Sequence, residues 1–231
     1  MKRIAIIPAR GNSKRLPRKN ILDFCGKPML IWTCEAALQS GLFHTILVST
    51  EDPEIAEVVG AYGFDVHRRP PDLASDTAGP RQVCTYVLDD LQKKGLTFDV
   101  LCCLYATAPL RTADDIRETL ALLEQKDVHF AQAVTTYNLP AYQMMIEDAA
   151  GFLIHAWPLV AGKKSQEIPQ AWIGNGSTYA AEVPLFRQYG FSGPGLKGYP
   201  MPLMRSVDID TREQFELALC CAEWQRRKCH E

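Results

Sequence analysis

The first 135 residues alternate short apolar runs with segments of helical periodicity, and this alternation constrains the fold more than any other feature of the sequence. The apolar runs predict strands at 4–7, 45–49, 65–66, 100–104 and 130–134. The helical spacing predicts helices at 29–40, 53–62, 80–91 and 113–123. Strands that alternate with helices indicate an α/β fold, and we expect a doubly wound, mostly parallel sheet with helices on its two faces.

The segment that follows the first predicted strand is strongly basic. It runs from Pro8 to Asn20, reads PARGNSKRLPRKN, and holds five cations between residues 10 and 19. Gly11 allows close approach of the backbone, Ser13 can donate a hydrogen bond, and Lys14 and Lys19 supply mobile charges. Two prolines and a glycine favour a fixed loop over a solvated charge run. We therefore expect it to hold a nucleoside triphosphate, although neither GxxxxGK[ST] nor GxGxxG is present.

The net charge of the chain favours a small-molecule ligand over nucleic acid or an anionic membrane surface. A formal net charge of −2 over 231 residues gives no general attraction to nucleic acid or to an anionic membrane surface. The eight cysteines form no C-x-x-C or Cys/His cluster, so they predict packing thiols in a reducing compartment, and we expect a cytoplasmic protein. No stretch reaches the roughly 18 apolar residues of a membrane span, and the first apolar run is too short for a signal peptide.

Five blocks of sequence resemble, in the same order, the CMP-sugar synthetases that activate nonulosonic (sialic-type) acids. They read IIPARGNSKRLPRKN, RPPDLASDT, ATAPLR, GNGSTY and DIDT, and begin at residues 6, 69, 106, 174 and 208. The resemblance implies a nucleotide-diphospho-sugar transferase-like fold and a single cytidylyltransferase domain over residues 1–231. It also implies transfer of CMP from CTP to an acidic nine-carbon sugar, with release of pyrophosphate.

The resemblance assigns the nucleotide site mainly to the basic loop. Arg10, Lys14 and Lys19 are expected to act in catalysis by clamping the phosphates, and a planar guanidinium suits Arg10 to this task. Without the resemblance, Asn20 would be interpreted as a turn residue and Arg69 as one of a solvated arginine pair. The expected nucleotide-binding residues are Ala9, Arg10, Gly11, Ser13, Lys14, Lys19, Asn20 and Arg69.

Two aspartates near the C-terminus are the expected ligands of Mg²⁺. Asp208 and Asp210 are spaced i, i+2, so in extended backbone their carboxylates point the same way, and hard oxygen ligands suit this ion. The segment from Asp210 to Glu213 also matches an N-terminal capping box, so Asp210 could cap the last helix, with or without a metal role. No histidine has the context of a general base, and the nucleophile is expected to be the substrate's own hydroxyl.

The acceptor side of the site matches the family less closely. The expected substrate-binding residues are Tyr105, Lys164, Gln166, Asn175 and Tyr179. Tyr105 stands where sialic acid synthetases show glutamine and favours the pseudaminic branch, whereas the segment 169–176 favours the sialic branch. Lys164 could bind the acceptor carboxylate or be solvated, and Tyr179 could be a core residue. Pseudaminic, legionaminic and sialic acids stay open, with a preference for the first two.

The regular alternation stops between about 137 and 172, which predicts an inserted arm. A partly apolar excursion of this kind usually packs on a partner, and the resembling family forms homodimers whose arms cap each other's sites; the alternative is a long surface loop. Beyond the arm we expect a turn at 192–198, a strand at 201–204 and a helix at 211–228. Two rival functions are a 3-deoxy-octulosonate-type cytidylyltransferase and a catalytically silent nucleotide-binding regulator.

Overall fold

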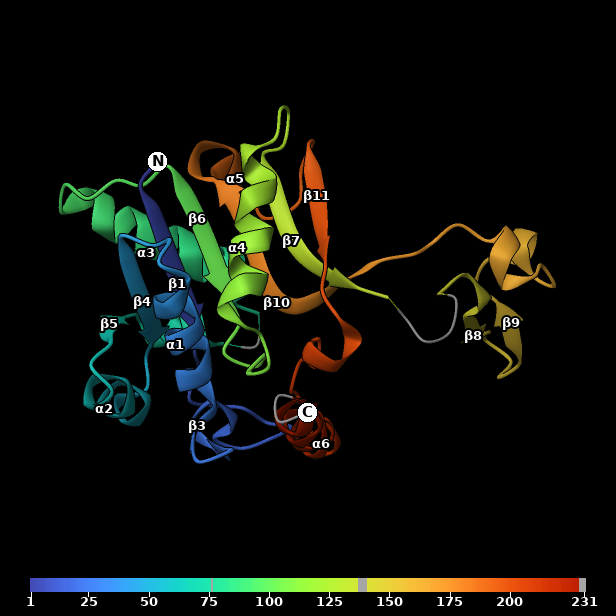
Figure 1. Cartoon of the computed structure of the whole chain (residues 1–231), viewed down its shortest axis with the longest axis horizontal. Coiled ribbons are helices and arrows are strands. Elements are labelled where there is room, and N and C mark those ends of the chain that lie inside the picture. The colour runs from blue at the N-terminus through green and yellow to red at the C-terminus, as the bar shows by residue number, and fades with distance from the viewer. Residues whose placement is uncertain (76, 137–140, 229–231) are drawn as a thin grey trace.

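A twisted sheet with helices on both faces forms the body of the molecule, as the computed structural model in Figure 1 shows. The structure describes residues 1–75, 77–136 and 141–228. Seven strands lie in the order β11-β7-β10-β6-β1-β4-β5; β10 is antiparallel to its two neighbours, and the other neighbouring strands of this sheet are parallel. The strands are β1 (Arg3–Pro8), β4 (Thr45–Thr50), β5 (Asp65–Arg68), β6 (Val100–Leu104), β7 (Phe130–Thr135), β10 (Ile173–Glu182) and β11 (Leu196–Pro200). The predicted doubly wound, mostly parallel sheet is confirmed.

Each face of the sheet packs on its own set of helices. The helices are α1 (Met29–Ser40), α2 (Pro53–Ala61), α3 (Pro80–Lys93), α4 (Ala113–Ala121), α5 (Val183–Tyr189) and α6 (Arg212–Lys228). Side chains of α1, α2 and α4 form one buried cluster with Cys102, and side chains of α3 and α5 form another with Cys103. Because successive strand residues face opposite sides, these adjacent cysteines pack into different cores. Burial raises the pKa of Cys34, in the first cluster, to about 12, as expected for a packing thiol.

The last strand lies earlier in the sequence than expected. β11 occupies residues 196–200 at the edge of the sheet and pairs with β7, whereas the predicted strand at 201–204 is wrong and Leu203–Arg205 is a 3₁₀ turn. Pro202 lacks the N–H that a further ladder bond needs, so pairing stops there. Part of the expected turn at 192–198 is therefore strand. Within the described parts of the chain, no helix combines the length and apolar character that crossing a bilayer requires.

The segment 141–172 adds no strand to the main sheet. β8 (Met145–Glu147) and β9 (Leu153–His155) pair with each other as a separate antiparallel hairpin. Figure 1 shows this hairpin projecting well away from the sheet. The first residues of the expected arm, 137–140, lie outside the described residues. Large apolar side chains of the arm are exposed, namely Met144, Met145, Ile146, Phe152, Leu153, Ile154, Trp157 and Leu159.

Candidate active site

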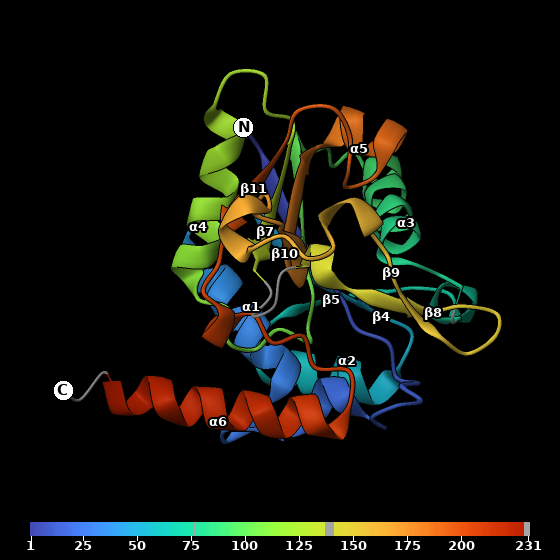
Figure 2. The same ribbon diagram turned by 90° about the vertical axis from the view of Figure 1, so that its right-hand side faces the viewer.

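A cavity of about 340 Å³ opens at the edge of the sheet where the parallel strands end. Pro8 ends β1, Arg69 follows β5 and Tyr105 follows β6, and all three line the cavity. Ligands of open α/β sheets bind beyond the carboxyl ends of the strands, so this is the expected place for a site. Figures 1 and 2 show α6 at the same end of the molecule, opposite the N-terminus. The remaining described lining residues are Arg10, Lys19, Asn20, Leu73, Ala78, Gly79, Pro80, Val83, Ala106, Thr107, Asp208 and Asp210.

Lys19 connects the basic loop to the acidic segment at the other side of the cavity. Its Nζ donates hydrogen bonds to the carbonyl oxygen of Ile209 at 2.9 Å and to Oδ1 of Asp210 at 2.5 Å. The side chain of Arg15 is exposed, and its Nη2 donates to Oδ2 of Asp210 at 2.5 Å. Asn20 is buried, and its Nδ2 donates to the carbonyl oxygen of Arg10 at 2.9 Å. The contacts of Lys19 and Asn20 therefore fix the loop against the cavity.

Four of the predicted nucleotide-binding residues, all from the first part of the loop, are absent from the cavity lining. The N–H of Ala9 donates to the carbonyl of Ser49 at 2.9 Å, and the N–H of Gly11 donates to Oε1 of Glu51 at 2.8 Å. A Cβ on Gly11 would overlap the carboxylate of Asp52, so only glycine fits there. Ser13 is buried and Lys14 is exposed. These four predicted nucleotide-binding residues do not themselves line the cavity, unlike Arg10, Lys19, Asn20 and Arg69.

Asp208 and Asp210 lie together in the wall but differ in their electrostatics. Burial raises the pKa of Asp208 above its ordinary value, against the opposing effect of a hydrogen bond with Thr107. Burial also acts to raise the pKa of Asp210, but the hydrogen bond from Lys19 and the charges of Lys19 and Arg15 outweigh it, so that pKa is lowered. Oδ1 of Asp208 is buried and has no hydrogen-bond partner among the described residues. Asp208 therefore has an oxygen available to a ligand, while Asp210 is held by cations.

Gly176 allows Asp208 to approach strand β10. Its φ of +67° is in the left-handed region, and a Cβ there would overlap the Asp208 carboxylate. Both observations exclude an ordinary side chain at this position.

The alternative that Asp210 caps the last helix is wrong, because Thr211 is the cap. The side-chain oxygen of Gln214 accepts from the N–H of Thr211 at 3.0 Å, and the hydroxyl of Thr211 accepts from the N–H of Gln214 at 3.3 Å. This reciprocal pair is a capping box with Thr211 as its first residue. The Asp210 carboxylate is instead directed to Lys19 and Arg15.

The expected acceptor residues fall into separate places. Tyr105 lines the cavity, and its ring lies 5.1 Å from that of Tyr179 between centroids. Asn175 is buried, donates to Oγ of Ser206 at 3.0 Å, and lines a second cavity of about 820 Å³ that shares Asp208 with the first. Lys164 and Gln166 are exposed on the projecting arm and line neither cavity of their own chain.

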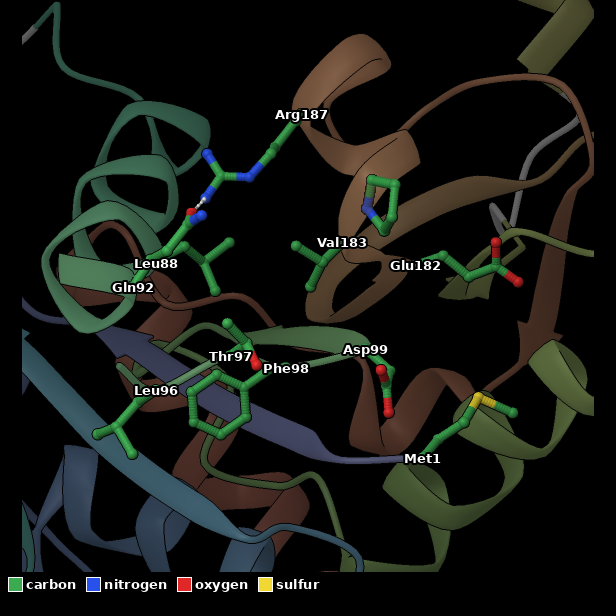
Figure 3. A pocket seen from close by; sticks show the side chains of 11 residues that line it. Met1, Leu88, Gln92, Leu96, Thr97, Phe98, Asp99, Glu182, Val183 and Arg187 are labelled. Carbon is green, nitrogen blue, oxygen red and sulfur yellow. Dashed lines mark hydrogen bonds between the residues drawn. The ribbon is translucent and has the colours of Figure 1, made fainter. Parts of the chain in front are cut away.

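A further cavity of about 560 Å³ lies at the opposite edge, where β1 and β6 begin (Figure 3). Its Arg187 is already paired with Gln92 at 3.1 Å and with Asp89 at 2.6 Å. None of the residues predicted for the site lines this cavity. The strand ends therefore favour the cavity that contains the basic loop.

Some residues of the site were missed by the sequence interpretation. Glu51 contacts the basic loop and Arg69, Thr107 hydrogen-bonds Asp208, and the start of α3 contributes Gly79 and Pro80 to the wall. A signal for Glu51 was present, because it closely follows the predicted strand 45–49 and so had to lie at the same edge as the basic loop.

Comparison with known sequences identifies the family. A sequence model described as "Cytidylyltransferase" matches residues 4–146. The chain is 33% identical over 220 residues to a pseudaminic acid cytidylyltransferase of Campylobacter jejuni, covering 94% of this chain and 95% of that protein. It is 30% identical over 219 residues to an N-acylneuraminate cytidylyltransferase of Streptococcus agalactiae, covering 93% of this chain and 52% of the relative.

Solved structures agree at the level of the fold. CMP:2-keto-3-deoxy-manno-octonic acid synthetase in complex with CTP superimposes with a TM-score of 0.70 at 18% identity, over 97% of this chain and all of that one. A 4-diphosphocytidyl-2C-methyl-D-erythritol synthase of Anaerococcus prevotii gives a TM-score of 0.65 at 11% identity, over 96% of this chain and 98% of the other. Family match, relatives and fold agree with the carboxyl-edge cavity and its basic loop: the chain belongs to the cytidylyltransferase family, in the group of the CMP-nonulosonic acid synthetases.

Proposed function

We propose that this protein transfers CMP from CTP to a nonulosonic acid and releases pyrophosphate. The observation that carries the proposal is the junction made by Lys19, which brings the cations of the basic loop and the carboxylates of 208–210 into one cavity wall. A triphosphate needs the cations, and a metal bound to that triphosphate needs the carboxylates. In the reaction, an acceptor hydroxyl oxygen attacks the α-phosphorus, the bond from that phosphorus to the β-phosphate oxygen breaks, and the acceptor's proton passes to solvent.

The basic loop is proposed to act mainly by electrostatics. Arg10, Lys14 and Lys19 would neutralise the phosphates and stabilise the departing pyrophosphate, because positioning and charge dominate catalysis of phosphoryl and nucleotidyl transfer. Ala9, Gly11, Ser13 and Asn20 would shape the loop and present its N–H groups. Arg69, at the far wall, would contact the base.

We propose that Asp208 and Asp210 contribute the protein ligands of Mg²⁺. Oδ1 of Asp208 has no hydrogen-bond partner in the described part of the chain, and a carboxylate oxygen of this kind fits a hard cation. Within the described ranges, no cluster of three or more His, Cys, Asp or Glu side chains forms a complete metal cage. That suits Mg²⁺, which is usually held by one or two carboxylates together with substrate phosphates. When bound, this ion supplies charge neutralisation to the phosphates.

The acceptor is proposed to bind where the two cavities meet at Asp208. Tyr105 and Tyr179 would contact the sugar from one side and Asn175 from the other. Because the named relatives act on pseudaminic acid and N-acylneuraminate, and because Tyr105 favours the pseudaminic branch, a pseudaminic-type acid is the preferred acceptor. Lys164 and Gln166 would act on the site of a second copy, so we propose a homodimer joined by the exposed apolar arm. The cytoplasmic location stays a prediction from the cysteine pattern.

The test is a panel of acids supplied with CTP and Mg²⁺, with pyrophosphate release as the readout. Pseudaminic, legionaminic and N-acetylneuraminic acids form the panel, and 3-deoxy-octulosonate is included for the rival enzyme. Turnover of a nonulosonic acid supports the proposal. Turnover of the octulosonate alone supports the rival transferase, and CTP binding without any turnover supports the silent regulator.

A further inference from the structure

Three consecutive strand ends bring Glu51 between the basic loop and Arg69. β4 lies between β1 and β5, with Ser49 opposite Pro8 and Thr50 opposite Arg68. Glu51 is the first residue after β4, and Arg69 the first after β5. Parallel pairing therefore fixes Gly11, Glu51 and Arg69 at one edge of the sheet.

Glu51 uses both of its carboxylate oxygens there. Oε1 accepts from the N–H of Gly11 at 2.8 Å, and Oε2 accepts from Nε and Nη2 of Arg69 at 3.0 and 2.8 Å. The side chain of Arg69 is 2% exposed and that of Glu51 14% exposed. One carboxylate thus connects the first turn of the basic loop with an arginine in the far wall of the cavity.

The pairing leaves Arg69 with a specific unused donor. Nη1 is buried, and none of the residues that the structure describes accepts a hydrogen bond from it. Burial lowers the pKa of Arg69 and the charge of Glu51 opposes that effect, so the glutamate helps to keep the guanidinium charged. Because the pair is neutral overall, it suits a neutral acceptor such as a ring carbonyl oxygen better than a phosphate, which the basic loop already provides for.

Glu51 is not needed to cap helix α2, because the next residue, Asp52, already does so. Asp52 caps α2, with Oδ1 accepting from the N–H groups of Glu54 at 2.8 Å and Ile55 at 3.0 Å. Glu51 makes no part of that cap. Its contacts go instead to Gly11 in the basic loop and to Arg69 in the cavity wall.

We propose that Glu51 is a positioning residue for the nucleotide: it orients Arg69 toward a carbonyl oxygen of the pyrimidine base and fixes the phosphate-binding loop at a set distance from it. This inference rests on the proposed function, because it assumes that a cytidine nucleotide occupies the cavity. It assigns Glu51 an effect on nucleotide affinity that is exerted through Arg69.

Glu51→Gln separates the two contacts. Glutamine retains a carbonyl oxygen for the Gly11 N–H but turns an amide NH₂ group toward the guanidinium. We expect the KM for CTP to rise about tenfold or more, as loss of a charge-assisted hydrogen bond would give, with kcat within about threefold of the parent. Affinity for inorganic triphosphate, which has no base, should change little. Glu57→Gln, on the exposed side of α2, is the matched control and should behave as the parent.

The double variant with Arg69→Met shows whether Glu51 acts through Arg69. In the Arg69→Met background, Glu51→Gln should raise the KM by less than about twofold, because the residue it positions is gone. A full additional rise in that background, or a parental KM in Glu51→Gln alone, overturns the proposal while the proposed function stands. A parent protein that neither binds nor turns over CTP overturns the proposed function itself. If Glu51→Gln does not fold, Glu51→Asp keeps the charge, displaces it by one methylene, and is expected to raise the KM in the same direction.

Discussion

Lys19 is the residue at which the basic loop and the acidic segment meet, so its removal should affect the reaction far more than the fold. In Lys19→Ala we expect kcat/KM to fall by about 100-fold or more, since a charge that stabilises the departing phosphates can contribute about 3 kcal/mol. The lost hydrogen bonds should lower the free energy of unfolding by only about 1 kcal/mol. Steady-state rates and denaturant unfolding measure the two effects.

Arg18→Ala is the control for this prediction. Arg18 is a cation of the same loop, but it is exposed, pairs with Glu54 and does not line the cavity. We expect its activity to stay near that of the parent. If Lys19→Ala keeps the activity of the parent, the contact between Lys19 and the acidic segment has no role in the reaction.

Amide substitution at Asp208 or at Asp210 should weaken the metal site, and the two variants should differ in a second effect. Among the described residues, Oδ1 of Asp208 has no hydrogen-bond partner, whereas both oxygens of Asp210 are paired with cations. Asp208→Asn should raise the Mg²⁺ concentration for half-maximal velocity and lower the maximal velocity, since an amide is a weaker ligand for a hard cation. Asp210→Asn should do the same and also weaken the contacts to Lys19 and Arg15. A Mg²⁺ titration of the pyrophosphate-release rate gives both parameters.

Thr211→Ala is the structural control for the acidic pair. It removes the cap of α6, which should cost about 1 kcal/mol of stability, and should leave the Mg²⁺ dependence as in the parent. Titrations of the two aspartate variants that superimpose on the parent's would mean that the pair is structural and that the nucleotide alone holds the metal.

For single residues, the sequence predicted sites within one continuous segment better than sites formed by residues that are distant in the chain. The basic loop is continuous in the chain, so Arg10 and Lys19 could be selected before their contacts were known, and the resemblance to the family added Asn20. Glu51 was missed because its role depends on its contacts with Gly11 and Arg69. Those contacts follow from the register of β1, β4 and β5, which the sequence alone does not give. Asp210 matched a helix cap in the sequence, but its carboxylate accepts hydrogen bonds from Lys19 and Arg15 instead of capping α6.

An ion pair between the buried Asp115 and the partly buried Arg205 joins the segment before Asp208 to helix α4. Asp115 is fully buried and accepts from Nε and Nη2 of Arg205 at 2.9 and 2.7 Å and from the hydroxyl of Tyr199 at 3.2 Å. Burial acts to raise the pKa of Asp115, but the hydrogen bonds from Arg205 and Thr112 outweigh it, so the pKa is lowered. Asp115→Asn should therefore destabilise the protein by about 3 kcal/mol at neutral pH, as breaking a buried pair usually does.

The pH dependence of that loss has a definite sign. A carboxyl whose folded-state pKa is lowered stabilises the fold above its unfolded-state pKa of about 3.9, and this contribution disappears as pH falls through the folded-state pKa. The difference in free energy of unfolding between parent and Asp115→Asn should therefore shrink in acid, as urea unfolding across pH would show. Asp114→Asn, whose side chain is 81% exposed, should change stability by no more than about 0.5 kcal/mol. A difference independent of pH would contradict this account.

Helices and strands were predicted well where their own residues determine where they begin and end. The central strands are continuous apolar runs, and α1 lies between Pro28 and Gly41, so it begins and ends where expected. β11 was misplaced because an edge strand pairs on one side only, and its mostly exposed residues 196–200 show no alternation of apolar and polar side chains. Its position is decided by pairing with β7, which is information from another part of the chain.

The whole molecule divides the proposed site between its body and its arm. The residues proposed to contact phosphate, metal and base all lie in the body, whereas Lys164 and Gln166 lie on the arm, which projects away from the main sheet (Figure 1). The arm also exposes Phe152 at 70%, Leu153 at 68% and Leu159 at 91% of their surfaces. Apolar surface gathered on an excursion usually marks an interface. A second copy of the chain would cover this apolar surface, and Lys164 of each arm would then lie at the site of the other copy.

We therefore expect a homodimer whose mass in solution is about twice the 25.8 kDa of the chain, with the two-fold symmetry usual for such assemblies. Leu153→Asp combined with Leu159→Asp should give a folded monomer by sedimentation. Leu38→Asp, which changes a residue 61% exposed on α1, should leave the dimer intact. A parent protein that sediments as a monomer at assay concentrations would contradict the arrangement.

Mixing two inactive variants tests whether the arm of one copy completes the site of the other. Lys19→Ala damages the body and Lys164→Ala the arm, so each homodimer has two defective sites. In a heterodimer, the body with Lys19 intact receives the arm with Lys164 intact, and one of its two sites is complete. Co-expression in equal amounts makes half of the dimers mixed and should therefore restore about a quarter of the parental activity. If Lys164 instead served the site of its own chain, every site in the mixture would carry one defect and no activity would return.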